Sequence, residues 1–235
     1  MYITTLGTGD AFDRESPNSA FHIGTSNGHW LFDCGPTVPS QLWAQGLADE
    51  IDVLFISHTH TDHCLGLATI MNYWCSIRRT KPLYLVCQKS QKNTLELLIQ
   101  LGIQHEQVMP FEVIWETSLS GSILGCRFET ALTQHSVPNH SLLLNEALFI
   151  SGDGKPSLDS LALMNRSNSI IHECEIDADS GNGHSGISEL LDKLPHQQQI
   201  YLYHFKELNR PQLERDSRYT GFKLLHTGQN IEVNS

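Results

Sequence analysis

The sequence predicts a layered α/β protein with mixed sheets. Short apolar runs of strand length occur early and late in the 235-residue chain, and longer runs typical of helices lie between them. With 40% hydrophobic and 17% charged residues, the composition is that of a folded protein able to bury a large core. The chain contains no internal repeat, low-complexity tract or obvious linker, so we expect one domain over residues 1–235.

The expected elements follow from apolar runs and the turn-forming residues around them. In chain order, the expected strands are residues 29–33, 51–57, 82–87, 111–116, 127–133, 168–173 and 199–204. The segment 141–151 predicts a hairpin that turns at Asn145 and Glu146. Helices are expected at about 64–79, 88–101 and 185–194, the last with Ser185 as a candidate N-cap.

Polar side chains recur at or just beyond the C-terminal ends of these strands. They are Asp33, His58, His135, Asp153 and His204. Side chains at such strand ends can converge along one edge of a sheet even when they are far apart in the sequence. The pattern therefore predicts a polar site at a sheet edge.

The segment FISHTHTDHCLG, residues 55–66, places three histidines and an aspartate directly after an apolar strand. His58 and His60 are two residues apart, so on an extended segment they face the same side and can hold one ion. Asp62 and His63 follow in the next turn and can face a second position. Imidazole nitrogen and carboxylate oxygen suit zinc, manganese or iron. A solvated loop that happens to be rich in histidine would explain this spacing poorly.

This HxHxDH loop resembles the signature of the metallo-β-lactamase superfamily, and the resemblance extends over nearly the whole chain. It implies a four-layer αββα sandwich with a dinuclear metal site on one edge. Three later segments resemble the remaining ligand motifs: LTQHSVPNH with His135, FISGDG with Asp153 and YLYHFK with His204. The implied ligands are His58, His60, His135 and Asp153 for one ion, and Asp62, His63, Asp153 and His204 for the other. The implied cofactors are two divalent ions, with zinc favoured and manganese or iron as alternatives.

Shorter matches resemble the ribonuclease Z and small-phosphodiesterase branch of this superfamily. They are LGTGDAFDRESPNSA, LFDCGPT and HECEIDADSGNGHSGISEL. By this resemblance Asp33 orients a ligand histidine, His184 protonates the leaving oxygen, and Glu173 holds His184 in position. The alternative for the last two is a glutamate at a strand end and a histidine in a helix-capping loop.

Charge and chain length restrict the expected substrate. The formal net charge is −11, which disfavours a surface for long nucleic acid. Residues 136–152 are too few for the long arm with which ribonuclease Z grips tRNA, and Lys206 stands where that branch carries a different polar residue. We therefore expect a dinuclear metal-dependent hydrolase of a small anionic phosphodiester, such as a cyclic nucleotide.

In the expected mechanism two ions hold a bridging hydroxide, and Asp62 orients it. Two alternatives remain. One is a thioester or lactone hydrolase using the same ions, and the other is a nuclease similar to those that process the 3′ end of tRNA.

Cysteine usage and hydropathy indicate the compartment. The six cysteines are scattered without a CxxC pair, and the segment MYITTLGTGDAF lacks the basic and apolar regions of a signal peptide. No stretch approaches about 18 consecutive apolar residues. We therefore expect a cytoplasmic protein with free thiols and no membrane partner. Relatives in this superfamily often dimerise, so a homodimer is expected by analogy.

Overall fold

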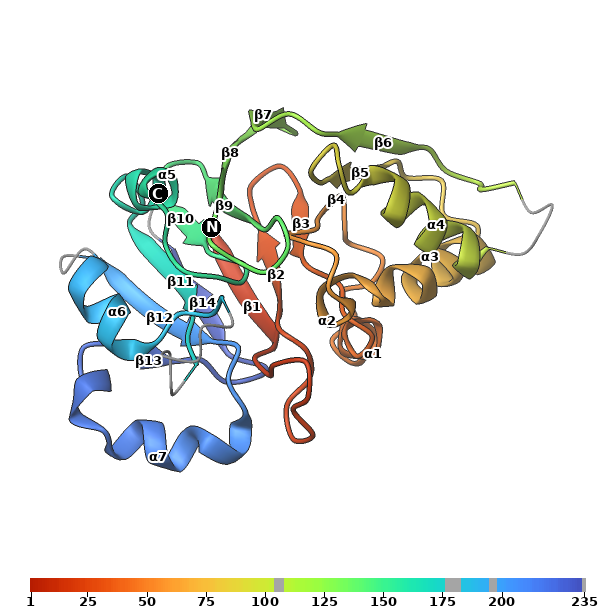
Figure 1. The fold of residues 1–235 in the computed structure, drawn as a ribbon. Coiled ribbons are helices and arrows are strands. Elements are labelled where there is room, and N and C mark those ends of the chain that lie inside the picture. Colours follow the sequence, from red (N-terminus) through yellow and green to blue (C-terminus); the bar gives the residue numbers. More distant parts are fainter. Residues whose placement is uncertain (104–107, 176–182, 195–197, 234–235) are drawn as a thin grey trace.

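Two mixed β-sheets packed face to face form the centre of the protein, and helices lie on both outer sides (Figure 1). The computed structural model describes residues 1–103, 108–175, 183–194 and 198–233. The two ends of the described chain lie side by side, because β1 pairs with β14. This arrangement is the predicted four-layer αββα sandwich.

The first sheet is antiparallel at one side and parallel at the other. Its strand order is β14 (Asn230–Glu232), β1 (Tyr2–Gly7), β2 (Ala20–Gly24), β3 (His29–Phe32), β4 (Val53–Phe55), β5 (Leu83–Val86) and β6 (Val113–Glu116). Its outer face is covered by α1 (Val38–Ala44), α3 (Gly66–Ser76) and α4 (Lys92–Gly102). The short α2 (Thr61–Cys64) comes directly before α3.

The second sheet also combines antiparallel and parallel pairs. Its order is β13 (Lys223–Leu224), β12 (Gln199–Tyr203), β11 (Ser169–Glu173), β10 (Leu148–Ile150), β9 (His140–Leu144), β8 (Cys126–Leu132) and β7 (Ser120–Ile123). Its outer face packs against α5 (Leu158–Met164), α6 (Ile187–Lys193) and α7 (Arg210–Arg215). Two 3₁₀ turns, η2 (Glu207–Asn209) and η3 (Ser217–Tyr219), flank α7.

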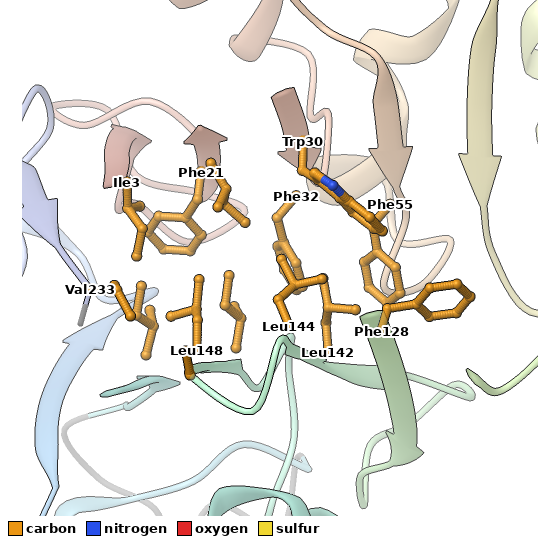
Figure 2. Packing of buried hydrophobic residues seen from close by; sticks show 14 of the residues in the cluster. Ile3, Phe21, Trp30, Phe32, Phe55, Phe128, Leu142, Leu144, Leu148 and Val233 are labelled. Atoms are coloured by element: carbon orange, nitrogen blue, oxygen red, sulfur yellow. The ribbon is translucent and has the colours of Figure 1, made fainter. Parts of the chain in front are cut away.

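Side-chain alternation along the strands explains why four layers form. In β4, Val53 and Phe55 point into the core between the sheets, while Leu54 points towards the helices. In β9, Leu142 and Leu144 enter the same central core (Figure 2). Leu143, which lies between them in the strand, packs on the opposite face. Because successive side chains of a strand face opposite sides, strands that are apolar throughout require a cover on both faces.

The structure confirms the expected strands, with ends that differ by a few residues, and confirms the hairpin between β9 and β10. Asn145 and Glu146 both have positive φ values, 50° and 57°, as a tight hairpin turn requires. The expected helix at 88–101 is α4.

Other elements differ from the prediction. The expected helix at 64–79 is two helices, since α2 begins at Thr61 and α3 at Gly66. Ser185 is not an N-cap: the cap of α6 is Gly186, and the Ser185 hydroxyl donates to the carbonyl of Gly154 instead. The sequence did not predict the strands β1, β2, β7, β13 and β14 or the helices α1, α5 and α7. These helices have only six or seven residues, too few to show a helical period.

Candidate metal centre

The C-terminal ends of strands from both sheets meet at one edge of the sandwich. His58 follows β4, Asp153 follows β10, and His204 directly follows β12. His135 follows β8, which runs in the same direction as β10 because both are antiparallel to β9. All seven ligands implied by the superfamily resemblance lie together at this edge.

The first group of potential ligands consists of His58, His60, His135 and Asp153. The Nδ1 atom of His60 lies 3.0 Å from Nε2 of His58 and 3.1 Å from Nε2 of His135. The Oδ2 atom of Asp153 lies 3.7 Å from Nε2 of His58 and 3.8 Å from Nε2 of His135.

The second group consists of Asp62, His63 and His204, with Asp153 beside them. The Oδ2 atom of Asp62 lies 3.2 Å from Nε2 of His63 and 3.5 Å from Nε2 of His204. Asp153 reaches the same nitrogens, with Oδ2 at 3.3 Å from His63 and Oδ1 at 3.5 Å from His204. Asp153 therefore belongs to both groups and links them.

These separations fit a cation at each group. Four ligand atoms placed tetrahedrally at zinc bond lengths lie roughly 3.3 Å from one another. Within the described part of the chain, Nε2 of His63 and Oδ1 of Asp153 are buried without a hydrogen-bond partner. Burying such polar atoms unsatisfied is costly, and a bound cation would satisfy both.

The charge states of these groups also suit divalent ions. Burial lowers the pKa values of His58, His60 and His135, which keeps these imidazoles neutral, as metal ligands must be. Burial opposes the ionisation of Asp153, but the charges of His204 and His63 outweigh it and hold its pKa well below the usual value. Asp62 is likewise ionised, because the nearby imidazoles of His204 and His63 outweigh burial and lower its pKa. The first group thus combines neutral imidazoles with an ionised carboxylate, which attracts a cation. In the second group Asp153 outweighs burial and raises the pKa values of His63 and His204, so these two imidazoles would lose a proton when an ion binds.

Residues behind the ligands fix the histidine orientations. Asp33 accepts hydrogen bonds from Nδ1 of His63 at 2.7 Å and from the Ser57 hydroxyl at 2.8 Å. Because that hydroxyl donates to Asp33, it accepts from Nδ1 of His58, 2.9 Å away. Nδ1 of His135 donates to the carbonyl of Gly183 at 3.1 Å. In each of these histidines Nδ1 is held by a neighbouring group, and Nε2 is the nitrogen that faces the cluster.

Asn139 is a supporting residue that sequence reasoning missed. It is fully buried, and its amide nitrogen donates to the carbonyls of Ser151 and Asp153, while its side-chain oxygen accepts from the amide of Asp153. Gly152 has a φ of 63°, and a Cβ atom there would lie 2.5 Å from Oδ1 of Asn139. The turn that carries Asp153 is therefore held in one conformation. No local sequence pattern links Asn139 to this turn, because the contact is tertiary.

Glu173 and His184 lie beside the ligands, as the resemblance implied. Glu173 is the last residue of β11 and is fully buried, and its Oε1 accepts from the amides of Gly154 and Ser185. Its Oε2 lies 3.5 Å from Nδ1 of His184, whose ring stacks on that of His204. Burial opposes protonation of His184, but Glu173 outweighs it and raises the pKa of His184 to about 9. Residues 176–182 of the matched motif lie outside the described residues.

An open cleft of about 390 Å³ reaches this cluster, a volume in the range of small-molecule sites. Its lining residues are Asp10, Ala11, Phe12, Thr59, His60, Thr61, Asp62, Asp153, Glu175, His184 and His204. His140 is not among them. It is buried in β9, and its backbone amide donates to the carbonyl of Ser57. The lining carries four carboxylates, which would repel an anionic substrate unless cations were bound.

The αββα sandwich and the edge cluster together define a metallo-β-lactamase-fold protein of the metal-dependent hydrolase class. Comparison with known families makes this more specific. The family model described as "Anti-Pycsar protein Apyc1" matches residues 1–229, and the chain belongs to this family.

Similar proteins include a member of this family and a ribonuclease Z. The anti-Pycsar protein Apyc1 of Paenibacillus harenae is 28% identical over 221 residues, which cover 87% of this chain and 90% of that protein. The ribonuclease Z of Methanococcus aeolicus is 35% identical, but only over 104 residues, 43% of this chain and 32% of that enzyme.

Solved structures support the fold. The short form of human tRNase Z (ELAC1) superposes with a TM-score of 0.81 at 21% identity, with both chains covered completely. A diphosphatase from the PhnP family also reaches a TM-score of 0.81, at 14% identity over 98% of this chain and 97% of that one. At these identities the likeness establishes the shared fold.

Proposed function

We propose that this protein is a metal-dependent phosphodiesterase that hydrolyses a small phosphodiester, with a cyclic nucleotide as the favoured substrate. The observation that carries the proposal is the position of Asp153, which is shared by two groups of ligands at the base of a small open cleft. The names of the relatives support it, since they include anti-Pycsar proteins and ribonucleases, and a ribonuclease cleaves phosphodiester bonds.

The metals in this proposal are two divalent ions, with zinc favoured by the ligand set and manganese or iron as alternatives. His58, His60, His135 and Asp153 would hold one ion, and Asp62, His63, His204 and Asp153 the other. When bound, two such ions lower the pKa of water and neutralise charge on phosphoryl oxygens. Without them, the carboxylates lining the cleft would oppose the binding of a phosphodiester.

The protein's own groups would complete the reaction. The oxygen of the attacking water bonds to phosphorus while one ester P–O bond breaks, and the water gives up one proton to the solvent. Asp62 lines the cleft, and its carboxylate is placed to accept a hydrogen bond from the attacking water and so orient it. Asp62 is a poor base, because its pKa is held far below neutrality.

His184 is the proposed general acid for the leaving oxygen. It lines the cleft, and its raised pKa keeps it protonated at neutral pH. It would give its proton to the departing alkoxide, and general acid catalysis of this kind commonly contributes 10²–10⁴-fold. Glu173 acts as a positioning residue, since it is buried behind His184 and anchored by the two backbone amides of Gly154 and Ser185.

A paired substrate assay tests the proposal. Metal-analysed protein would be supplied with bis(p-nitrophenyl) phosphate and with 2′,3′- and 3′,5′-cyclic nucleotides, and in parallel with a thioester, a lactone and a precursor tRNA. We expect diester hydrolysis with close to two ions per chain, and no processing of the tRNA. Hydrolysis of the thioester or lactone alone would keep the metal site but overturn the substrate class.

We further propose that residues 1–235 form one domain acting in the cytoplasm. In support, all six cysteines are buried free thiols, and both sheets contribute to the central core. None of the helices in the described ranges combines the length and apolar character needed to span a bilayer. A homodimer remains a prediction, which sedimentation analysis of the metal-loaded protein would check.

A further inference from the structure

We propose that the side chain of Phe12 is the platform on which the base of the substrate stacks, an inference that rests on the proposed cyclic-nucleotide substrate. Phe12 lies in the loop between β1 and β2 and is 81% exposed. The same side chain lines the cleft that contains Asp62, His184 and His204. Among the described lining residues it is the one large apolar side chain.

The loop that carries Phe12 is tied to the metal centre. The amide of His204 donates to the carbonyl of Thr8 at 2.9 Å, directly before the loop. On its far side, Asp13 accepts from the amide of Glu207 at 2.8 Å. The position of Phe12 is thus coupled to the segment that supplies a ligand histidine.

Hydrogen bonds within the loop also fix its backbone. Oδ1 of Asp10 accepts from the amide of Phe12 at 2.8 Å, and the amide of Gly9 donates to the carbonyl of Pro17 at 2.9 Å. The hydroxyls of Thr8 and Ser16 lie 3.1 Å apart. A backbone held in this way limits the region that the phenyl ring can occupy, so less conformational freedom is lost when a ligand stacks on it than on a free loop.

The chemistry of a nucleotide matches the two parts of this cleft. The metal ligands lie at its polar end, where a phosphodiester would bind, and Phe12 supplies an apolar surface in the same volume of about 390 Å³. A nucleobase has a flat π-face that stacks on aromatic side chains, and stacking tolerates any base. A single exposed phenylalanine is ordinary on a protein surface. Phe12 differs because it lines the cleft at the metal-ligand cluster and lies on an anchored loop, and this location indicates a role in binding the substrate.

The test compares substrates that share a phosphodiester ring but differ in the base. The substrates are 3′,5′-cyclic AMP, 3′,5′-cyclic UMP and the 3′,5′-cyclic phosphate of methyl riboside, which has no base. Wild-type protein would be compared with Phe12→Ala, Phe12→Trp and Leu158→Ala. The last is a matched control, since Leu158 is 86% exposed and does not line the cleft.

We expect Phe12→Ala to reduce kcat/KM for both cyclic nucleotides by roughly 5- to 100-fold, mainly through KM, and to leave the base-free substrate unchanged. Phe12→Trp should restore most of the activity. Calorimetry should show the same selective loss in binding of AMP compared with ribose 5-phosphate.

The two proposals fail in different ways. An equal effect of Phe12→Ala on substrates with and without a base, or no effect on either, would overturn the stacking role while diester hydrolysis stands. If wild-type protein hydrolyses none of these three diesters and none of the diesters in the paired assay, the proposed function fails and the stacking role fails with it.

Discussion

Oδ2 of Asp33 lies 2.7 Å from Nδ1 of His63, and both groups are fully buried. The same carboxylate accepts the hydroxyl and amide hydrogens of Ser57, so it anchors the whole turn after β4. Asp33 itself has a φ of 60°, an unusual conformation for a residue other than glycine. The backbone around the metal centre is therefore shaped to place this carboxylate.

Asp33→Asn should weaken metal binding by roughly 10- to 100-fold. The neutral amide has only one acceptor oxygen, so it cannot accept the hydrogen bonds of both His63 and Ser57 as the carboxylate does. Competitive titration with a metal-binding dye measures this. Asp159→Asn, on the first turn of α5, is the control and should bind metal like the wild type. Unchanged affinity in Asp33→Asn would show that the hydrogen bond does not orient the ligand.

His63→Ala should remove about one metal equivalent per chain and most hydrolytic activity. The second group then loses one of its two imidazoles, while the first group retains its ligands. Elemental analysis of dialysed protein gives the metal content. Retained activity with one ion bound would exclude a two-metal mechanism.

His184→Ala should slow hydrolysis of diesters with alkoxide leaving groups by roughly 10²- to 10⁴-fold. Diesters with a p-nitrophenolate leaving group should be much less affected, because that group departs without a proton. The ratio of the two rates separates acid catalysis from loss of structure. Equal slowing of both substrates would argue for a structural role of His184.

His22, which is not among the candidate metal ligands, predicts a component of the acid sensitivity of the fold. Burial, together with the nearby His29, lowers the pKa of His22 from 6.5 to about 4 in the folded state. The unfolded chain therefore binds the proton more readily, and stability that is present above pH 6.5 is lost as the pH falls towards 4. The full effect is about 3 kcal/mol.

His22→Gln should retain a hydrogen bond to His29, whose Nδ1 lies 2.9 Å from Nε2 of His22, and should remove this proton uptake. Urea unfolding of metal-free protein at pH 7 and pH 4.5 measures the difference. The free energy of unfolding should fall less for the variant than for the wild type. Parallel losses in both proteins would show that His22 is not the responsible group.

Local sequence predicted most of the strands and the candidate metal-binding loop. The apolar runs around β4 and β9 predict strands because side chains alternate between the faces of a strand over short distances. His58, His60, Asp62 and His63 lie within six positions, so their spacing alone indicates a metal site. The resemblance to the metallo-β-lactamase superfamily then added His135, Asp153 and His204, and the structure brings all three to the cluster.

Tertiary structure decided what surrounds these ligands. Asn139 contacts the Asp153 turn across a pair of strands, and Asp33 reaches His63 from a different strand of the first sheet. The loop carrying Phe12 is held at the cleft because Thr8 and Asp13 accept hydrogen bonds from the amides of His204 and Glu207, which lie nearly two hundred residues later in the sequence. Such contacts depend on how the sheets pack. No period or spacing encodes them. The sequence by itself therefore determined the candidate ligands in the loop from His58 to His63, and the packing of the two sheets determined the form of the cleft.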